Sequence, residues 1–203
     1  MLKKTKQVRA QKTRDALIRS AIDVVRKSGF ENTRIQDISD HAGVTPGAIL
    51  YHFRNLETLL MEAFRADFDD LLSAVVQPDA LSQLSNDEIV SATLEMLEDK
   101  AFQARIGVLT EFLIGARKDS KRKRLVENVM SANRDQLVER FGSGFGFAID
   151  GERLWGIIDI VISLLVARQL NYPSARRSGK PLELAKPLIE QELLRLLEET
   201  RSR

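Results

Sequence analysis

The stretch that decides the fold is residues 33–60, which read TRIQDISDHAGVTPGAILYHFRNLETLL. Thr33-Arg34-Ile35-Gln36 has the spacing of a capping box, so a short helix is expected to begin there. Gly43 stands where a tight turn needs a residue without a Cβ atom. Thr45-Pro46 supplies an N-cap followed by proline at the first helical position, which predicts a second short helix to about residue 53. Two short capped helices joined by a glycine turn are typical of a helix-turn-helix.

The flanking sequence supplies the helices that such a unit packs against. Apolar periodicity predicts a helix from about Thr13 to Ser28, which Gly29 ends through a positive φ angle. Asn55 can cap a long helix that follows. The side chains expected on the inner faces of the first three helices are Ala16, Leu17, Ala21, Val24, Val25, Ile35, Ile38, Ala42, Val44, Ile49 and Phe53.

The remainder of the chain is predicted to be helical, since strand signals are nearly absent. A glycine-rich segment, Gly142–Gly146, is expected to be a loop. The predicted fold class is therefore all-α, with a helix-turn-helix domain in residues 1–55 and a helical domain in residues 56–203. The helices expected in that second domain after the first long one cover about 85–100, 102–117, 122–141, 152–171 and 182–199.

Charge is distributed unevenly along the 203 residues, although the net charge is only +2. Residues 1–65 hold 12 Lys and Arg against seven Asp and Glu, whereas the rest of the chain holds 19 against 22. The first fourteen residues hold six basic side chains and no acid. Either an anionic polymer binds this basic arm, or the arm is a solvated tail, and charge alone favours neither.

Several classes of protein are disfavoured. The chain has no cysteine, which excludes disulfides and is compatible with the reducing cytoplasm that we expect as its compartment. The longest apolar stretch, Leu154 to Leu170, is interrupted by Asp159 and Arg168, so no membrane span is expected. The two histidines offer almost nothing for a metal site or a catalytic triad, so neither a metal, nor a cofactor, nor an enzymatic activity is expected.

The predicted helix-turn-helix leaves one set of side chains facing outward. Gly47 and Ala48 are small enough to let the backbone approach a groove wall, while Tyr51 and His52 can donate to phosphate oxygens. Gln36 could pair with adenine, and Arg34 could pair with guanine or with phosphate. The alternatives are an ordinary helical corner in an enzyme and, for Tyr51 and His52, packing against the first helix. The outward set on the second short helix is Thr45, Pro46, Gly47, Ala48, Leu50, Tyr51 and His52.

At these residues the sequence resembles the TetR family of bacterial transcriptional regulators. The resemblance implies a three-helix DNA-binding domain, a helical ligand-binding domain, a homodimer, and repression of a palindromic operator that a small molecule relieves. The matching positions are Gly29-Phe30, Thr33, Asp37-Ile38, Ala42 to Gly47, Tyr51-His52-Phe53 and Leu59.

Two positions depart from the family pattern. The family often has tyrosine where this chain has Leu50, and it favours lysine where this chain has Leu56. Both family residues commonly touch phosphate, and Arg54 can substitute for the lysine. A ligand-independent or activating regulator remains an alternative, and a helical enzyme is a more distant one.

The second domain gives weaker signals. Charged and aromatic residues within apolar helices are the only indications of a ligand site, and the candidates are Phe102, Arg105, Glu111 and Phe112. On the helix at 152–171, small or polar residues form a stripe that either faces a twofold mate or faces solvent. The last helix has a broad apolar face that includes Ile189. The predicted dimer contacts are Gly156, Asp159, Ser163, Ala167, Leu193 and Leu196.

Overall fold

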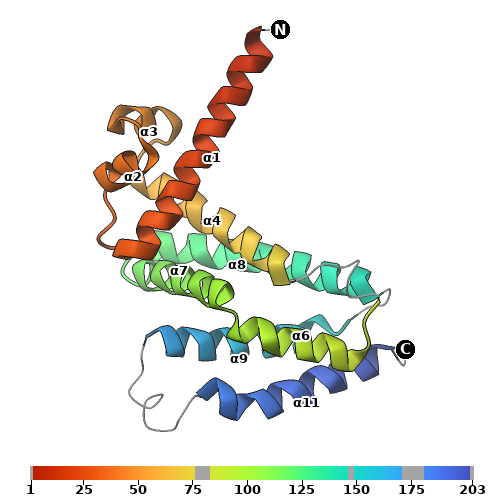
Figure 1. The fold of residues 1–203 in the computed structure, drawn as a ribbon. Coiled ribbons are helices and arrows are strands. Elements are labelled where there is room, and N and C mark those ends of the chain that lie inside the picture. The colour runs from red at the N-terminus through yellow and green to blue at the C-terminus, as the bar shows by residue number, and fades with distance from the viewer. Residues whose placement is uncertain (1, 76–82, 146–148, 171–180, 202–203) are drawn as a thin grey trace. The chain divides into compact units, whose positions relative to one another are not determined.

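The computed structural model describes residues 2–75, 83–145, 149–170 and 181–201, and every regular element in these ranges is an α-helix (Figure 1). The predicted all-α class is therefore confirmed. The helices are α1 (Leu2–Ser28), α2 (Ile35–Ala42), α3 (Pro46–His52), α4 (Leu56–Val75), α6 (Asn86–Glu98), α7 (Lys100–Ala116), α8 (Ser120–Phe145), α9 (Gly151–Gln169) and α11 (Pro181–Arg201).

The chain divides into two compact units. The N-terminal unit comprises residues 1–68 together with 111–127, and the C-terminal unit comprises 69–110 together with 128–203. The unit that holds the predicted helix-turn-helix thus extends beyond residue 55 and takes in a segment from the middle of the chain. Three helices, α4, α7 and α8, contribute residues to both units.

The core of the N-terminal unit has two parts. The first lies where α1, α2 and α3 meet. The second is a set of aromatic rings: Phe112 has its centroid 5.5 Å from Phe30 and 5.2 Å from Phe64, and Phe64 stacks on Phe68 at 5.8 Å. Burying each ring contributes roughly 1.5–3 kcal/mol, so the rings hold 111–127 in this unit. Of the predicted inner residues, Leu17, Ala21, Val24, Val25, Ile38, Ile49 and Phe53 are buried, and Ile35, Ala42 and Val44 are half-buried. Ala16 is exposed, so its predicted place on the inner face is wrong.

In the C-terminal unit, α11 packs against both α6 and α9. Leu197 clusters with Ile89 and Val90 of α6, and Leu196 clusters with Leu154 and Ile157 of α9. These two adjacent leucines divide the apolar face of α11 between two neighbours. The helix is therefore covered on two sides within the chain itself.

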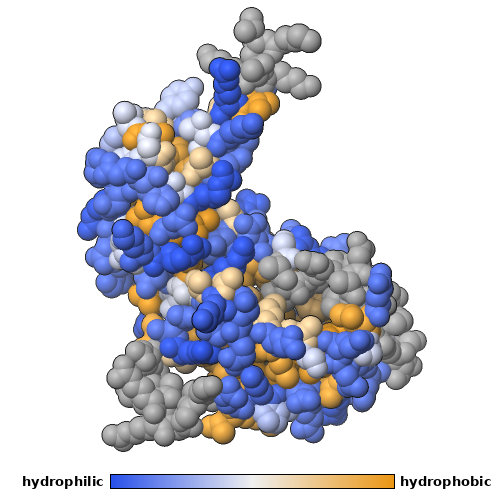
Figure 2. All heavy atoms as spheres, in the orientation of Figure 1, coloured by the Kyte–Doolittle hydropathy of each residue, from blue (hydrophilic) through white to orange (hydrophobic). Residues whose placement is uncertain are grey.

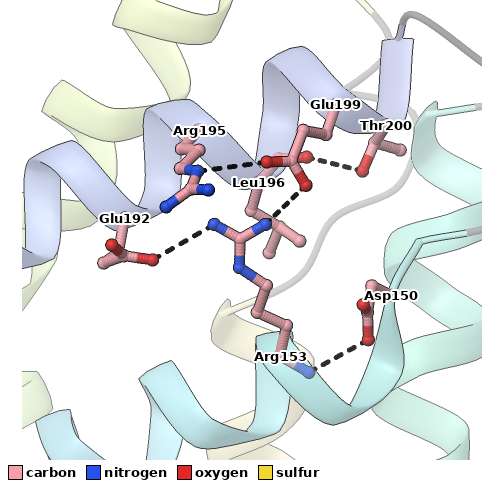
Figure 3. Close-up of polar contacts among 7 residues, drawn as sticks. All are labelled: Asp150, Arg153, Glu192, Arg195, Leu196, Glu199 and Thr200. Carbon is pink, nitrogen blue, oxygen red and sulfur yellow. Dashed lines mark hydrogen bonds and ion pairs between the residues drawn. The ribbon is translucent and has the colours of Figure 1, made fainter.

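A polar network joins α9 to α11 beside that core (Figure 3). The Arg153 guanidinium donates to Glu199 at 2.5 Å and to Glu192 at 3.2 Å, and Arg195 donates to Glu199 at 3.1 Å. The hydrogen bond to Glu192 and the charges of both carboxylates raise the pKa of Arg153 above its ordinary value. Exposed ion pairs contribute little stability, so this network mainly fixes how α9 and α11 align.

Two predicted helix boundaries are wrong. The first helix begins at Leu2 rather than near Thr13, whose hydroxyl donates to the Arg9 carbonyl inside the helix at 3.0 Å. No glycine or proline interrupts residues 2–28, so nothing stops the helix from including the basic arm. Likewise α8 continues through the predicted loop as far as Phe145, because a glycine inside a helix costs only about 1 kcal/mol. Gly146 lies outside the described residues.

None of the helices that the structure describes combines the length and the apolar character needed to cross a membrane.

Candidate nucleic-acid interface

The turn between α2 and α3 has the geometry that the sequence predicts. Gly43 ends α2 with φ +67° and ψ +33°, a left-handed conformation that side chains with a Cβ rarely adopt. Thr45 caps α3, since its hydroxyl accepts the Ala48 N–H at 3.3 Å, and Pro46 occupies the first helical position. At the other end of α3, the Asn55 side chain accepts the Thr58 N–H at 2.8 Å and so caps α4. The predicted helix-turn-helix is confirmed.

The capping box of α2 is displaced by one residue from its predicted place. The Asp37 carboxylate accepts the N–H of Arg34 at 3.0 Å, so Arg34 and not Thr33 is the N-cap residue. Thr33 is buried, and its hydroxyl donates to the carbonyl of Gly29 at 2.8 Å. The threonine is therefore used to close the end of α1, and the predicted pairing of Thr33 with Gln36 is wrong.

The residues predicted to contact DNA lie on α2, on α3 and in the segments that flank α3. Tyr51 is 83% exposed and Leu50 is 49% exposed, whereas Ile49, which precedes them on α3, is fully buried. Exposure of 83% excludes the alternative that Tyr51 packs against α1. Ala48 and His52 are half-buried, and the exposed members of the set are Arg34, Gln36, Thr45, Pro46, Gly47, Leu50, Tyr51 and Arg54.

The Tyr51 ring is held by its neighbour. It meets the His52 ring edge-to-face, with centroids 5.2 Å apart and an interplanar angle of 88°. This aromatic pair orients the phenol of Tyr51 away from the buried side of α3. A phenolic hydroxyl in that position is available as a hydrogen-bond donor.

The two polar residues expected to read bases are engaged within the N-terminal unit. The Arg34 guanidinium donates to the carbonyl oxygens of Glu31 at 2.8 Å and Thr33 at 3.2 Å. The Gln36 amide donates to the Asp40 carboxylate at 2.7 Å. These bonds restrict how each side chain can turn toward a base, and a bidentate contact through the bonded nitrogen would have to replace them.

The basic side chains of α1 serve two purposes. Arg9 and Lys12 are exposed. Arg14 instead forms an ion pair with Glu62 of α4, and its guanidinium lies 4.9 Å from the centre of the Phe53 ring. Arg14 is thus part of the packing of the N-terminal unit, whereas Arg9 and Lys12 are available to an external anion.

A second contact set in this unit was not predicted from the sequence. The Phe30 N–H, just after α1, donates to the Glu111 carboxylate of α7 at 3.1 Å, and a Cβ atom added at Gly115 would overlap the Phe30 ring. Arg122 of α8 lies 5.3 Å from the same ring and donates to Glu57 of α4 at 3.3 Å. These residues hold the turn after α1 against the α7–α8 segment. No local sequence pattern connects them.

The four predicted ligand residues are not brought together. Glu111 and Phe112 have the structural partners just described in the N-terminal unit. Phe102 and Arg105 lie on α7 in the C-terminal unit, both half-buried, and the Nη1 atom of Arg105 is buried without a hydrogen-bond partner. Within the described ranges, no three acidic or histidine side chains are grouped as a metal site would need. A cavity of about 130 Å³ in the C-terminal unit is lined by Asp69, Leu72, Asn133, Gln136, Leu137 and Arg140.

The predicted dimer contacts fall on different sides of their helices. On α9, Gly156, Asp159 and Ser163 are exposed and Ala167 is half-buried. On α11, Leu196 is buried in the core of its own protomer, and Leu193 packs against the same cluster. The apolar residues that remain in solvent are Ile160 on α9, 59% exposed, and Leu184 and Leu188 on α11, each 66% exposed.

Residues 17–63 match the sequence profile described as "Bacterial regulatory proteins, tetR family". A protein of Escherichia coli K12 named for repression of the acrEF/envCD operon is 38% identical over 96 residues, 44% of this chain and 43% of that protein. The HTH-type transcriptional regulator TtgR of Pseudomonas putida is 31% identical over 116 residues, 56% of this chain and 54% of that protein. The chain spans about half the length of the curated relatives that it matches.

Solved structures resemble the fold over nearly the whole chain. A transcriptional regulator from Rhodococcus has a TM-score of 0.65 and 19% identity, and the match covers 92% of this chain and 97% of that one. The fatty acid degradation regulator FadR of Bacillus halodurans has a TM-score of 0.61 and 17% identity, with coverage of 90% and 94%. Profile, relatives and fold agree with the geometry of α2, Gly43 and α3. Residues 17–63 therefore match the N-terminal module of the TetR family of bacterial regulatory proteins, and the fold of the described residues resembles that of solved transcriptional regulators.

Proposed function

We propose that this protein is a dimeric, sequence-specific DNA-binding regulator that represses transcription from a palindromic operator until a small-molecule effector releases it. The observation that carries the proposal is α3, whose inner residue Ile49 is buried while Leu50 and Tyr51 stand exposed on its outer face. This short helix follows a glycine turn, and one of its sides is buried while the other is exposed. Such a helix can enter the major groove of DNA. The name of the E. coli relative supports repression.

Phosphate contacts are assigned to Tyr51 and to basic side chains around the helix-turn-helix. The Tyr51 phenol can donate to a phosphate oxygen, which fixes orientation without reading sequence. Arg9, Lys12 and Arg54 are exposed cations, and each phosphate they neutralise releases a counterion. Binding should therefore weaken steeply as salt concentration rises.

Operator binding can be tested with paired variants of Tyr51. A duplex selected from a random pool by the full-length protein would be titrated by fluorescence anisotropy against wild type, Tyr51→Phe and Tyr51→Ala. Tyr51→Phe removes one donor to a charged oxygen and should weaken binding by about tenfold or more, with unchanged thermal stability. Failure of the wild type to select any sequence would refute the proposal, and full affinity in both variants would remove Tyr51 from the contact set.

The dimer is assigned to the outer faces of α9 and α11. Gly156, Ile160, Ser163 and Ala167 follow one another on α9 at four-, three- and four-residue steps, so they share a face. A Cβ atom added at Gly156 would have no neighbour within 4 Å, which leaves room for a second helix to approach closely. Two half-sites one turn of DNA apart need such a twofold protein.

The effector is assigned to the C-terminal unit. An unpaired, buried guanidinium nitrogen costs free energy, and an acceptor oxygen of a ligand would supply the bond that Nη1 of Arg105 lacks. The cavity beside Asn133 and Arg140 gives polar lining to the same unit. We therefore expect an effector that carries a carboxylate or another strong acceptor.

A thermal-shift screen of carboxylate-bearing metabolites would test the effector. A true effector should raise the Tm of the wild type and release it from the selected duplex, and Arg105→Met should lose both responses while still binding the duplex. Lys100→Met, which removes an exposed cation at the start of the same helix α7, is the matched control. If no compound alters DNA affinity, the ligand-independent alternative is correct.

A further inference from the structure

The outer face of α3 is almost entirely apolar, although it is the surface proposed to meet base edges. The structure describes α3 in full, and its seven residues, PGAILYH, include no carboxylate, amide, lysine or arginine. Figure 2 shows the result as pale and orange atoms gathered over α3, with hydrophilic atoms around them. Leu50 is the large aliphatic side chain in this group, and about half of its surface is exposed to solvent.

Leu50 lies on one side of α3 with residues that allow close approach. Pro46 and Gly47 precede it by four and three positions, so all three share a face of the helix. Both are exposed, and Gly47 carries no side chain that could hold a groove wall away from Leu50. The isobutyl group is therefore the most prominent apolar group on this face.

Neighbouring polar groups do not compete for the same role. The Thr45 hydroxyl caps α3 by accepting from Ala48, and the Gln36 amide is bonded to Asp40. Arg34 is bonded back to carbonyl oxygens of its own segment. Since Tyr51 is assigned to a phosphate, the half-buried His52 is the polar side chain of α3 that is left for hydrogen-bonded base readout.

We propose that Leu50 is a specificity-determining residue that recognises the 5-methyl group of a thymine in each operator half-site. In the major groove, the thymine methyl is the base-edge feature that offers apolar contact, and cytosine lacks it. An exposed leucine gains free energy when it leaves water against such a group. This assignment rests on the proposed function, since it requires operator binding through α3.

The test uses DNA in which single thymines are replaced by deoxyuridine, which removes the methyl and leaves base pairing intact. The duplex selected by the full-length wild type would be substituted one thymine at a time and titrated against wild type, Leu50→Ala and Leu125→Ala. Leu125 is the matched control, because it is an exposed leucine of the same unit on α8.

At one thymine per half-site, deoxyuridine should weaken wild-type binding about fourfold, and about fifteenfold when both half-sites carry it. Leu125→Ala should show the same losses. Leu50→Ala should bind the thymine and deoxyuridine duplexes equally at that position. The assignment is overturned if no deoxyuridine affects the wild type, or if Leu50→Ala retains the full loss. A wild type that selects no duplex at all would instead refute the proposed function.

Discussion

Two surfaces of the molecule leave large apolar side chains in water, and they differ in what surrounds those side chains. On α3, Leu50 is exposed on a helix of seven residues, four positions before the exposed cation Arg54. On α9 and α11, Ile160 and Leu188 are exposed on helices of 19 and 21 residues. An apolar side chain close to a cation fits a polyanion that carries methyl groups, whereas exposed apolar side chains on long helices fit another helix pair.

Exposure of apolar residues does not by itself identify a partner. Both surfaces would be described as apolar patches if charge and extent were ignored. The same side-chain type is assigned to base recognition in one unit and to self-association in the other. Each assignment can be broken separately, since the two surfaces belong to different units.

The largest expected effect is on the α11 surface. Leu188→Glu should produce monomers, because a charge would be placed on the face proposed to meet a second copy. Loss of the second half-site should then lower operator affinity by about a hundredfold or more. Light scattering combined with a DNA titration would measure both, and Glu190→Lys, on the opposite side of α11, should leave both unchanged. A dimeric Leu188→Glu protein would place the interface elsewhere.

The next largest effect is expected on the stability of the N-terminal unit, where Phe30 packs on Gly115. Gly115→Ala would force its Cβ into the Phe30 ring and should destabilise the N-terminal unit by roughly 1–3 kcal/mol. Gly107→Ala on the same helix meets only Gln169, at an ordinary 3.6 Å, and should be neutral or stabilising by up to about 1 kcal/mol. Thermal unfolding would compare them, and equal stability of the two variants would contradict the contact.

A smaller effect is expected from the charge of the basic arm. Replacing Arg9 and Lys12 with glutamine should reduce the slope of log affinity against log salt by up to about two, since each neutralised phosphate contributes about 0.9. The loss should be the same for every duplex, because phosphate contacts carry no sequence information. Lys123→Gln, which removes a cation that faces Glu127, is the control. An unchanged slope would mean that the basic arm is only solvated.

The smallest effect lies away from both surfaces, at the cap of α6. The Ser85 N–H and hydroxyl donate to Glu88, and these bonds lower the pKa of that carboxyl. Its folded pKa lies below the unfolded one, so the stabilisation is present at neutral pH and is lost as the pH falls through the folded value. The free energy of unfolding, measured with urea, should fall slightly less between pH 7 and pH 3 for Glu88→Gln than for the wild type. An equal difference would mean that the cap does not titrate.

The helix-turn-helix could be predicted because its signals are local. Gly43, Thr45 and Asn55 each act within a few residues of their own position, and each does what the sequence pattern indicates. The error at Thr33 arose because two helix ends compete for one hydroxyl, and the sequence does not show which one obtains it. Periodicity predicted the helices of the C-terminal unit, yet it placed the end of α8 at Phe141 instead of Phe145.

The contacts that join distant segments could not be predicted. Phe30 meets Glu111 and Gly115, and Arg14 meets Glu62, across separations that carry no periodic signal. A charged residue in an apolar helix suggested a ligand role for Glu111, but a buried N–H elsewhere in the chain can need that carboxylate just as well. The apolar pattern of α11 does not show which of its apolar residues face the core of the same unit. Only their burial in the structure shows that Leu184 and Leu188 stay exposed.

The Phe30 ring lying on Gly115 links the evolutionary histories of two positions that are far apart in the chain. While an aromatic residue occupies position 30, every replacement at 115 adds atoms where the ring already is. A lineage could acquire alanine at 115 only after, or together with, a smaller residue at 30. In a mutagenesis screen, second-site revertants of Gly115→Ala should therefore map to codon 30 before any other.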